Sequence, residues 1–102
     1  MAEPVTVRFL VRIEALPGRE TDVEDFLQHG LTLVQDEPAT VRWVAFRFGP
    51  SSFGIYDAFP DDAGRQRHLN GPVGQALAEN TGTLFEQPTI EPVHVIAEKS
   101  PI

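Results

Sequence analysis

The stretch FGIYDAFPDDAGRQRHL, residues 53–69, decides the fold because a strand, a helix start and a helix follow one another in it. Phe53–Phe59 is mostly aromatic and apolar, which is typical of a strand. The Pro-Asp-Asp sequence at 60–62 puts two carboxylates in the first turn of a helix, where the helix dipole favours negative charge. The stretch also brings a phenol, a carboxylate, two guanidinium groups and an imidazole into one region, on Tyr56, Asp57, Arg65, Arg67 and His68.

Upstream of this stretch, the sequence predicts a strand, a helix and a second strand. Val5–Leu16 alternates with period two, as in a strand with one buried face. Apolar residues at helical spacing from Arg19 to about Gln35 predict an amphipathic helix, and Thr21-x-x-Glu24 matches a capping box that would begin it slightly later. Val41–Phe48 is the second strand. The Gly-Pro-Ser-Ser turn at 49–52 then makes strands two and three antiparallel neighbours.

Downstream, the first helix after Pro60 runs to about Asn70, and Val73–Asn80 forms a further helix after a Gly-Pro break. Thr89–Glu98 is the last strand, with Pro92 expected at an edge or bulge because it lacks an N–H. The order β-α-β-β-α-β predicts an α+β, ferredoxin-like split βαβ domain, in which helices cover one face of a four-stranded antiparallel sheet. The length of 102 residues suits a single domain, 1–102.

Composition argues against several classes of partner. The net charge is −7, with seven arginines and one lysine, so binding to nucleic acid is disfavoured. No apolar run approaches the ~20 residues that span a bilayer, and the first residues lack the pattern of a secretory signal. The chain has no cysteine, which fits the cytoplasm. Histidines at metal-binding spacing, dinucleotide fingerprints and P-loops do not occur in the sequence, so we expect no metal and no cofactor.

The sheet has a second face that the helices of one chain do not cover. We expect this face to mix apolar and basic side chains: Leu10, Trp43, Ala45 and Tyr56 with Arg8, Arg12 and Arg47. A large patch of this kind marks an interface or a ligand cavity. We therefore predict a homodimer whose two sheets pack face to face, with pockets between sheet and helices.

Taken together, the opening strand with Pro17-Gly18-Arg19-Glu20, the tract VRWVAFR at 41–47, and FGIYDAF at 53–59 leading to Arg67-His68-Leu69 resemble the antibiotic biosynthesis monooxygenase superfamily of dimeric α+β-barrel domains. The resemblance covers nearly the whole chain, and a helix histidine, here His68, recurs in these domains. The superfamily includes enzymes that oxidise phenols, anthrones and quinols with O2 and without metal or flavin. It also includes haem-degrading enzymes, but their strand Asn is missing here and Tyr56 stands where they have Trp.

The resemblance implies a cofactor-independent monooxygenase that deprotonates a small aromatic, quinol or polyketide-like compound so that the anion reduces O2. The protein must then take a proton, stabilise an anion and exclude water. We assign His68 as base, Tyr56 and Arg47 as oxyanion partners, and Trp43 as a stacking wall. Asn70 is a candidate to hydrogen-bond a substrate carbonyl.

Each of these residues has a structural interpretation as well. His68 is either the base or a helix-end side chain that orders a loop, and Trp43 either stacks on substrate or packs in the dimer interface. Tyr56 is a donor or an ordinary strand residue, while Asp57, on the opposite face, would pair with Arg65 or Arg67. Arginines on a sheet face usually pair with carboxylates such as Glu14, Glu91 or Glu98, and Asn before Gly-Pro ends a helix. The alternative function is a non-catalytic dimeric domain that binds a small hydrophobic metabolite.

Overall fold

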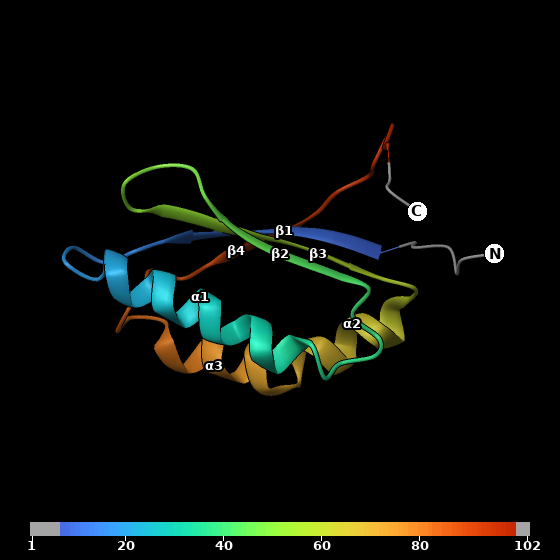
Figure 1. The fold of residues 1–102 in the computed structure, drawn as a ribbon, viewed down its shortest axis with the longest axis horizontal. Helices are drawn as coiled ribbons and strands as arrows, with labels where there is room; N and C mark the ends of the chain where they lie inside the picture. Colours follow the sequence, from blue (N-terminus) through green and yellow to red (C-terminus); the bar gives the residue numbers. More distant parts are fainter. Residues whose placement is uncertain (1–6, 100–102) are drawn as a thin grey trace.

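The fold is a single antiparallel sheet with all its helices on one side (Figure 1). The computed structural model describes residues 7–99. In chain order the elements are β1 Val7–Glu14, α1 Glu20–Val34, β2 Arg42–Arg47, β3 Ser52–Phe59, α2 Asp62–Leu69, α3 Pro72–Asn80 and β4 Thr89–Pro92. The four strands lie in the order β2-β3-β1-β4 and every pair is antiparallel. The predicted α+β, ferredoxin-like arrangement is confirmed.

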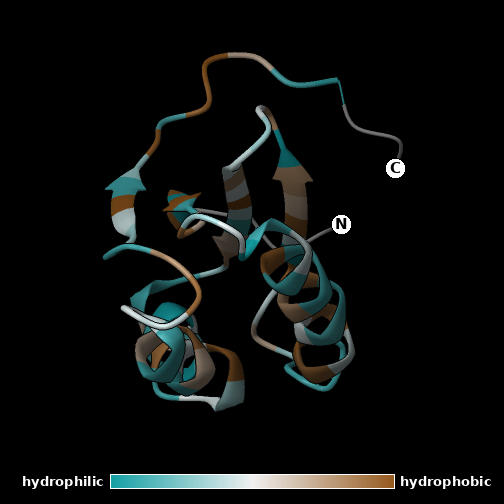
Figure 2. Cartoon of the chain, turned by 90° about the vertical axis from the view of Figure 1, so that its left-hand side faces the viewer, coloured by the Kyte–Doolittle hydropathy of each residue, from teal (hydrophilic) through white to brown (hydrophobic). Residues whose placement is uncertain are grey.

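The core lies between the sheet and the helices. Alternate residues of β1 and β3 point towards the helices, and they pack against apolar residues of α1 and against Phe85. Phe53, Phe59, Phe85, Ile13 and Val23 are the largest side chains that are fully buried. Figure 2 shows the sheet end-on, with the helices on one side and the segment that follows β4 passing over the other. We call this other side of the sheet the open face.

The strand register corrects our prediction for the open face. Trp43, Ala45 and Arg47 of β2 pair with Asp57, Ile55 and Phe53 of β3, all of which face the helices. Directly paired residues share a face, so these three β2 side chains lie on the helix side. The open face instead carries Val44 and Phe46 from β2, together with Leu10 and Tyr56, whose placement is confirmed. Alternate side chains of a strand point to opposite faces of the sheet. In β2 both groups of alternate side chains contain apolar residues, so the sequence pattern alone did not identify the group that faces the helices.

Several predicted boundaries also change. Helix α1 begins at Glu20, and its cap residue Arg19 makes no side-chain capping bond, so the predicted capping box is wrong. Strand β4 ends at Pro92 rather than Glu98. Its place at the edge of the sheet suits a residue without an N–H, as predicted. Val5 and Thr6 of the first predicted strand lie outside the described residues.

None of the helices found in residues 7–99 combines the length and the apolar character that crossing a membrane requires.

The corner between α2 and α3 depends on a glycine. A Cβ atom added at Gly74 would lie 2.1 Å from the carbonyl oxygen of Leu69 and 2.7 Å from its carbon, both backbone atoms that cannot move without shifting a helix. We predict that Gly74→Ala lowers the free energy of unfolding by about 1–3 kcal/mol, the usual cost of overpacking. Gly49→Ala is the matched control because its Cβ would meet only the Ser52 side chain at 3.4 Å. Urea denaturation of both variants is the measurement, and equal stability would contradict the prediction.

Candidate functional site

His68 lies at the centre of a buried polar cluster built from three segments. It belongs to the last turn of α2, and its Nδ1 is 2.6 Å from Oε1 of Glu37, in the loop that follows α1. Its Nε2 is 3.5 Å from Oδ2 of Asp57 on β3. The side chains of His68 and Asp57 are 7% and 6% exposed, so water screens this pair little. We call His68, Glu37 and Asp57 the His68 cluster.

The cluster favours a protonated imidazole. Burial lowers the pKa of His68, but the hydrogen bonds and negative charges of Asp57 and Glu37 raise it, and the balance lies above the ordinary value of 6.5. Both ring nitrogens face carboxylates, so a ligand meets the carboxylate of Asp57 more readily than the imidazole itself. Thr40 also donates to Oε1 of Glu37, at 2.8 Å, which fixes that carboxylate.

Unsatisfied polar atoms gather around the same cluster. Within residues 7–99, four buried side-chain atoms lack a hydrogen-bond partner: Oε2 of Glu37, Nε1 of Trp43, Oδ1 of Asp57 and Nη1 of Arg65. Two belong to the cluster, and Trp43 is paired with Asp57 across β2 and β3. Nη1 of Arg65 lies 3.7 Å from Asp62, too far for a hydrogen bond, and its guanidinium lies over the Phe9 ring. Buried polar atoms are nearly always paired, so this concentration marks a candidate functional site.

Three cavities adjoin the site. One has a volume of about 190 Å³ and is lined by Glu37, Thr40 and His68 among others. The other two differ in size. The smaller one, which we call the His68 cavity, has a volume of about 30 Å³ and apolar walls that include Phe9, Ile55 and Phe59; Asp57, Arg65 and His68 supply its polar atoms. This is room for about one water molecule. The larger one lies between α1 and β2 and has a volume of about 430 Å³. That falls within the range of small-molecule pockets.

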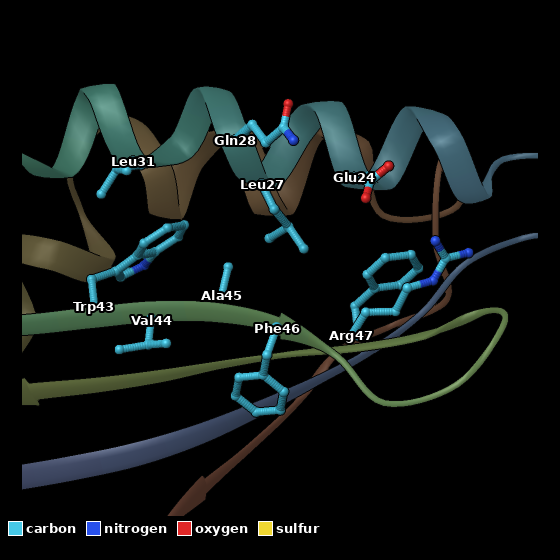
Figure 3. A pocket seen from close by; sticks show the side chains of 10 residues that line it. Glu24, Leu27, Gln28, Leu31, Trp43, Val44, Ala45, Phe46 and Arg47 are labelled. Atoms are coloured by element: carbon cyan, nitrogen blue, oxygen red, sulfur yellow. The ribbon is translucent and has the colours of Figure 1, made fainter.

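The larger cavity, which we call the α1–β2 pocket, is drawn in Figure 3. Trp43 and Ala45 point from β2 towards Leu27 and Leu31 of α1, while Glu24, Gln28 and Arg47 supply polar groups (Figure 3). The outer edge of the indole lies against Gly30, where an added Cβ would be 3.2 Å from Cη2 of Trp43. The pocket is therefore an apolar slot with one aromatic wall and a few polar groups.

The structure brings two of the five predicted site residues together, since Trp43 and His68 lie on two sides of Asp57. Tyr56 lies on the open face and accepts a hydrogen bond from Nη1 of Arg8 at 2.7 Å. Arg47 lines the α1–β2 pocket, but its guanidinium donates to the carbonyls of Gly49 and Pro50 and lies over the Phe53 ring. Exposed Asn70 is the C-cap of α2, as its structural interpretation predicted.

The carboxylates of Asp57 and Glu37 contact His68, which the sequence did not predict. Asp57 faces the helices, as expected, but its ion partner is His68 rather than Arg65 or Arg67. The contact of Glu37 with His68 was not predicted, because nothing in the sequence links residues 31 positions apart. Arginines of β1 pair with carboxylates, as expected in general: Arg8 with Glu98 and Arg12 with Glu91. Glu14 instead accepts hydrogen bonds from Ser51 and Ser52. Among residues 7–99, no group of three or more His, Asp or Glu side chains is placed to hold a metal ion.

Comparison with solved structures gives the family. The NE2512 protein of Nitrosomonas europaea, a protein of unknown function, is 45% identical, with 99% of each chain covered and a TM-score of 0.91. The chain belongs to the same family as NE2512. No protein-family model and no curated protein matches the chain.

More distant structures show the fold. PA3566 of Pseudomonas aeruginosa is 17% identical, with 95% of this chain and 100% of that chain covered and a TM-score of 0.82. An antibiotic biosynthesis monooxygenase is 15% identical, with 90% of this chain and 100% of that chain covered and a TM-score of 0.78. The family of NE2512 therefore has the antibiotic biosynthesis monooxygenase fold, which confirms the fold expected from the sequence.

The raised pKa of His68 predicts how stability depends on pH. The folded chain holds the His68 proton more tightly than the unfolded chain does. The contribution of this proton to the free energy of unfolding is therefore complete below about pH 6.5 and is lost as pH rises through the raised pKa of His68. We predict that the free energy of unfolding of the wild type, relative to His68→Gln, falls across this range. Urea titrations from about pH 6 to pH 9 measure it, and a difference that does not vary with pH would contradict the prediction.

Proposed function

We propose that this protein is a cofactor-independent monooxygenase that oxidises a small hydroxyaromatic or quinol-like compound with O2. The observation that carries the proposal is the buried Asp57, which offers an unpaired Oδ1 while its Oδ2 is coupled to His68. A carboxylate held in this way is suited to take a proton from an acidic substrate. The antibiotic biosynthesis monooxygenase fold is consistent with this chemistry but does not establish it.

In the proposed reaction the substrate supplies all the electrons. A phenol O–H bond breaks, the proton passes to Oδ1 of Asp57 and the electron pair stays on the phenolate oxygen. The electron-rich ring then reduces O2: a ring carbon forms a bond to one oxygen atom, and the O–O bond and the C–H bond of that carbon break. The second oxygen atom leaves as water with the ring hydrogen and the proton held by Asp57, giving a quinone. His68, assigned as the base from the sequence, acts here through Asp57: its Nε2 positions the carboxylate, and its bond to Glu37 holds the imidazole ring in place.

The second candidate is binding without catalysis. It is favoured by the separation of the two cavities, since the α1–β2 pocket can admit an aromatic ring but the His68 cavity has a volume of only about 30 Å³. In this case the protein carries a small hydrophobic metabolite against Trp43, and the His68 cluster is a structural element. Oxygen consumption separates the two candidates.

We predict that Asp57→Asn and His68→Gln each lower O2 uptake with an anthrone or quinol substrate by ~10²-fold or more, the scale expected for loss of acid–base catalysis. Asp25→Asn, which changes an exposed carboxylate on α1, is the control and should leave the rate unchanged. An oxygen electrode measures the rates. Binding of these compounds by the wild type without O2 uptake would support the second candidate.

The place of His68 near the end of α2 suggests that the chain would tolerate His68→Ala, but this variant is a poor test of activity. The imidazole is buried and contacts two carboxylates, so its removal leaves Asp57 without its ion partner and leaves Glu37 with only the hydrogen bond from Thr40. We expect this variant to lose about 2 kcal/mol or more of stability, the cost of stranding buried polar groups. His68→Gln retains a side chain able to form hydrogen bonds and therefore separates loss of activity from loss of folding.

We also propose that two copies of the chain pack with their open faces together. This face exposes Val44, Phe46 and Phe48, and the segment after β4 adds Val95 and Ile96, the latter 99% exposed. Apolar groups gathered on one side of a small domain are typical of an interface. The Phe46 ring reaches from the edge strand β2 over Gly54 of β3, where an added Cβ would be 2.6 Å from it.

We predict that Phe46→Glu converts a dimer into a monomer, because a buried unpaired charge would face its symmetry mate across the interface. Light scattering at micromolar concentration measures the mass. Gln66→Glu, on the exposed surface of α2, adds the same charge and should leave a dimer intact. A wild type with the mass of a single chain would refute the proposed dimer.

A further inference from the structure

The unpaired atoms of Trp43 and Asp57 are chemically complementary and lie on adjacent strands. The two residues are direct partners in the register of β2 and β3, and both face the helices. The Cβ atoms of such a pair are about 4.5–5.5 Å apart. Nε1 of Trp43 can only donate a hydrogen bond, and an ionised Oδ1 of Asp57 can only accept one. Neither atom has a partner within residues 7–99.

A single hydroxyl group satisfies both atoms at once. Its oxygen accepts from the indole N–H and its hydrogen is donated to the carboxylate. A carbonyl oxygen could bond only to the indole, and an ammonium group only to the carboxylate. The pair therefore has the donor and acceptor pattern of a site that recognises a hydroxyl.

The surroundings determine what carries the hydroxyl. Trp43 forms a wall of the α1–β2 pocket beside Leu27, Leu31 and Ala45, so a flat apolar body fits there (Figure 3). The indole is held by packing alone, against Gly30, because its nitrogen has no partner in the described chain. A ring that enters the pocket therefore meets the indole first. Asp57 lines the His68 cavity rather than the pocket, so a hydroxyl on that ring reaches it only if the indole moves aside.

We propose that Trp43, which lines the α1–β2 pocket, and Asp57, which lines the neighbouring His68 cavity, form a hydroxyl-binding pair between the two cavities, and that it selects phenols over their ethers. This inference deepens the proposed function, on which it rests for the fate of the proton, but the binding step does not require oxidation. Asp57 also carries a charge, and hydrogen bonds to ionised acceptors are about twice as strong as neutral ones. Methylation removes the hydrogen that the hydroxyl donates, so Oδ1 of Asp57 would stay buried without a donor, which is the more costly outcome.

The test uses 1-naphthol and its methyl ether, in which a methyl group replaces the hydroxyl hydrogen. Because the chain has one tryptophan, its nitrogen-15 spectrum contains one indole N–H resonance. We expect 1-naphthol to bind on the order of tenfold more tightly than the ether, as loss of a charge-assisted hydrogen bond implies, and to shift the indole resonance. Calorimetry measures the affinities without reference to O2 uptake.

Two variants test whether Trp43 and Asp57 cause the preference for 1-naphthol over its ether. Trp43→Phe retains a ring but removes the N–H, and Asp57→Asn retains the shape but removes the charge. Each should reduce the preference for 1-naphthol to about two- to threefold or less. Tyr56→Phe, which removes a hydroxyl on the open face, is the matched control and should leave the preference unchanged.

Equal affinity of the wild type for the two probes, or binding of 1-naphthol that leaves the indole resonance in place, would overturn the inference. So would a preference that persists in both variants. If 1-naphthol is preferred and the variants lose the preference, but no O2 is consumed with any substrate, the hydroxyl-binding pair stands and the monooxygenase proposal fails.

Discussion

The contact of His68 with two carboxylates is the interaction on which the site depends. It joins the loop after α1, strand β3 and helix α2, which are three segments far apart in the sequence. A buried imidazolium between two carboxylates is electrically compensated, whereas any one of the three groups alone would be costly to bury. The cluster therefore fixes the positions of Asp57 and Glu37 at the price of leaving one oxygen of each without a partner.

Those unpaired oxygens connect stability to function. A small domain gains little from a half-satisfied polar network, and an apolar core at this position would be at least as stable. The unpaired atoms have a role if they bind a ligand that is present only when the protein functions. The indole nitrogen of Trp43 extends the same pattern to the neighbouring strand and links the cluster to the larger α1–β2 pocket.

The two faces of the sheet carry different functional features. The inner face carries the core, the His68 cluster and the pocket. The open face carries an exposed apolar group around Phe46 and the Arg8–Tyr56–Glu98 contacts. Tyr56 and Asp57 are neighbours in sequence, but they belong to different faces and therefore to different tasks.

The sequence by itself determined the elements, their order and hence the fold, because these are local properties: strand and helix periodicities at residues 5–16 and 19–35, and composition and the Pro-Asp-Asp helix start at residues 53–69. It also identified His68 and Trp43 as residues of interest. Only the tertiary structure decided which set of β2 side chains faces the helices, because that depends on the register with β3 rather than on alternation. Likewise, only folding brings Glu37 to His68, since a contact between residues 31 positions apart leaves no periodic trace in the chain.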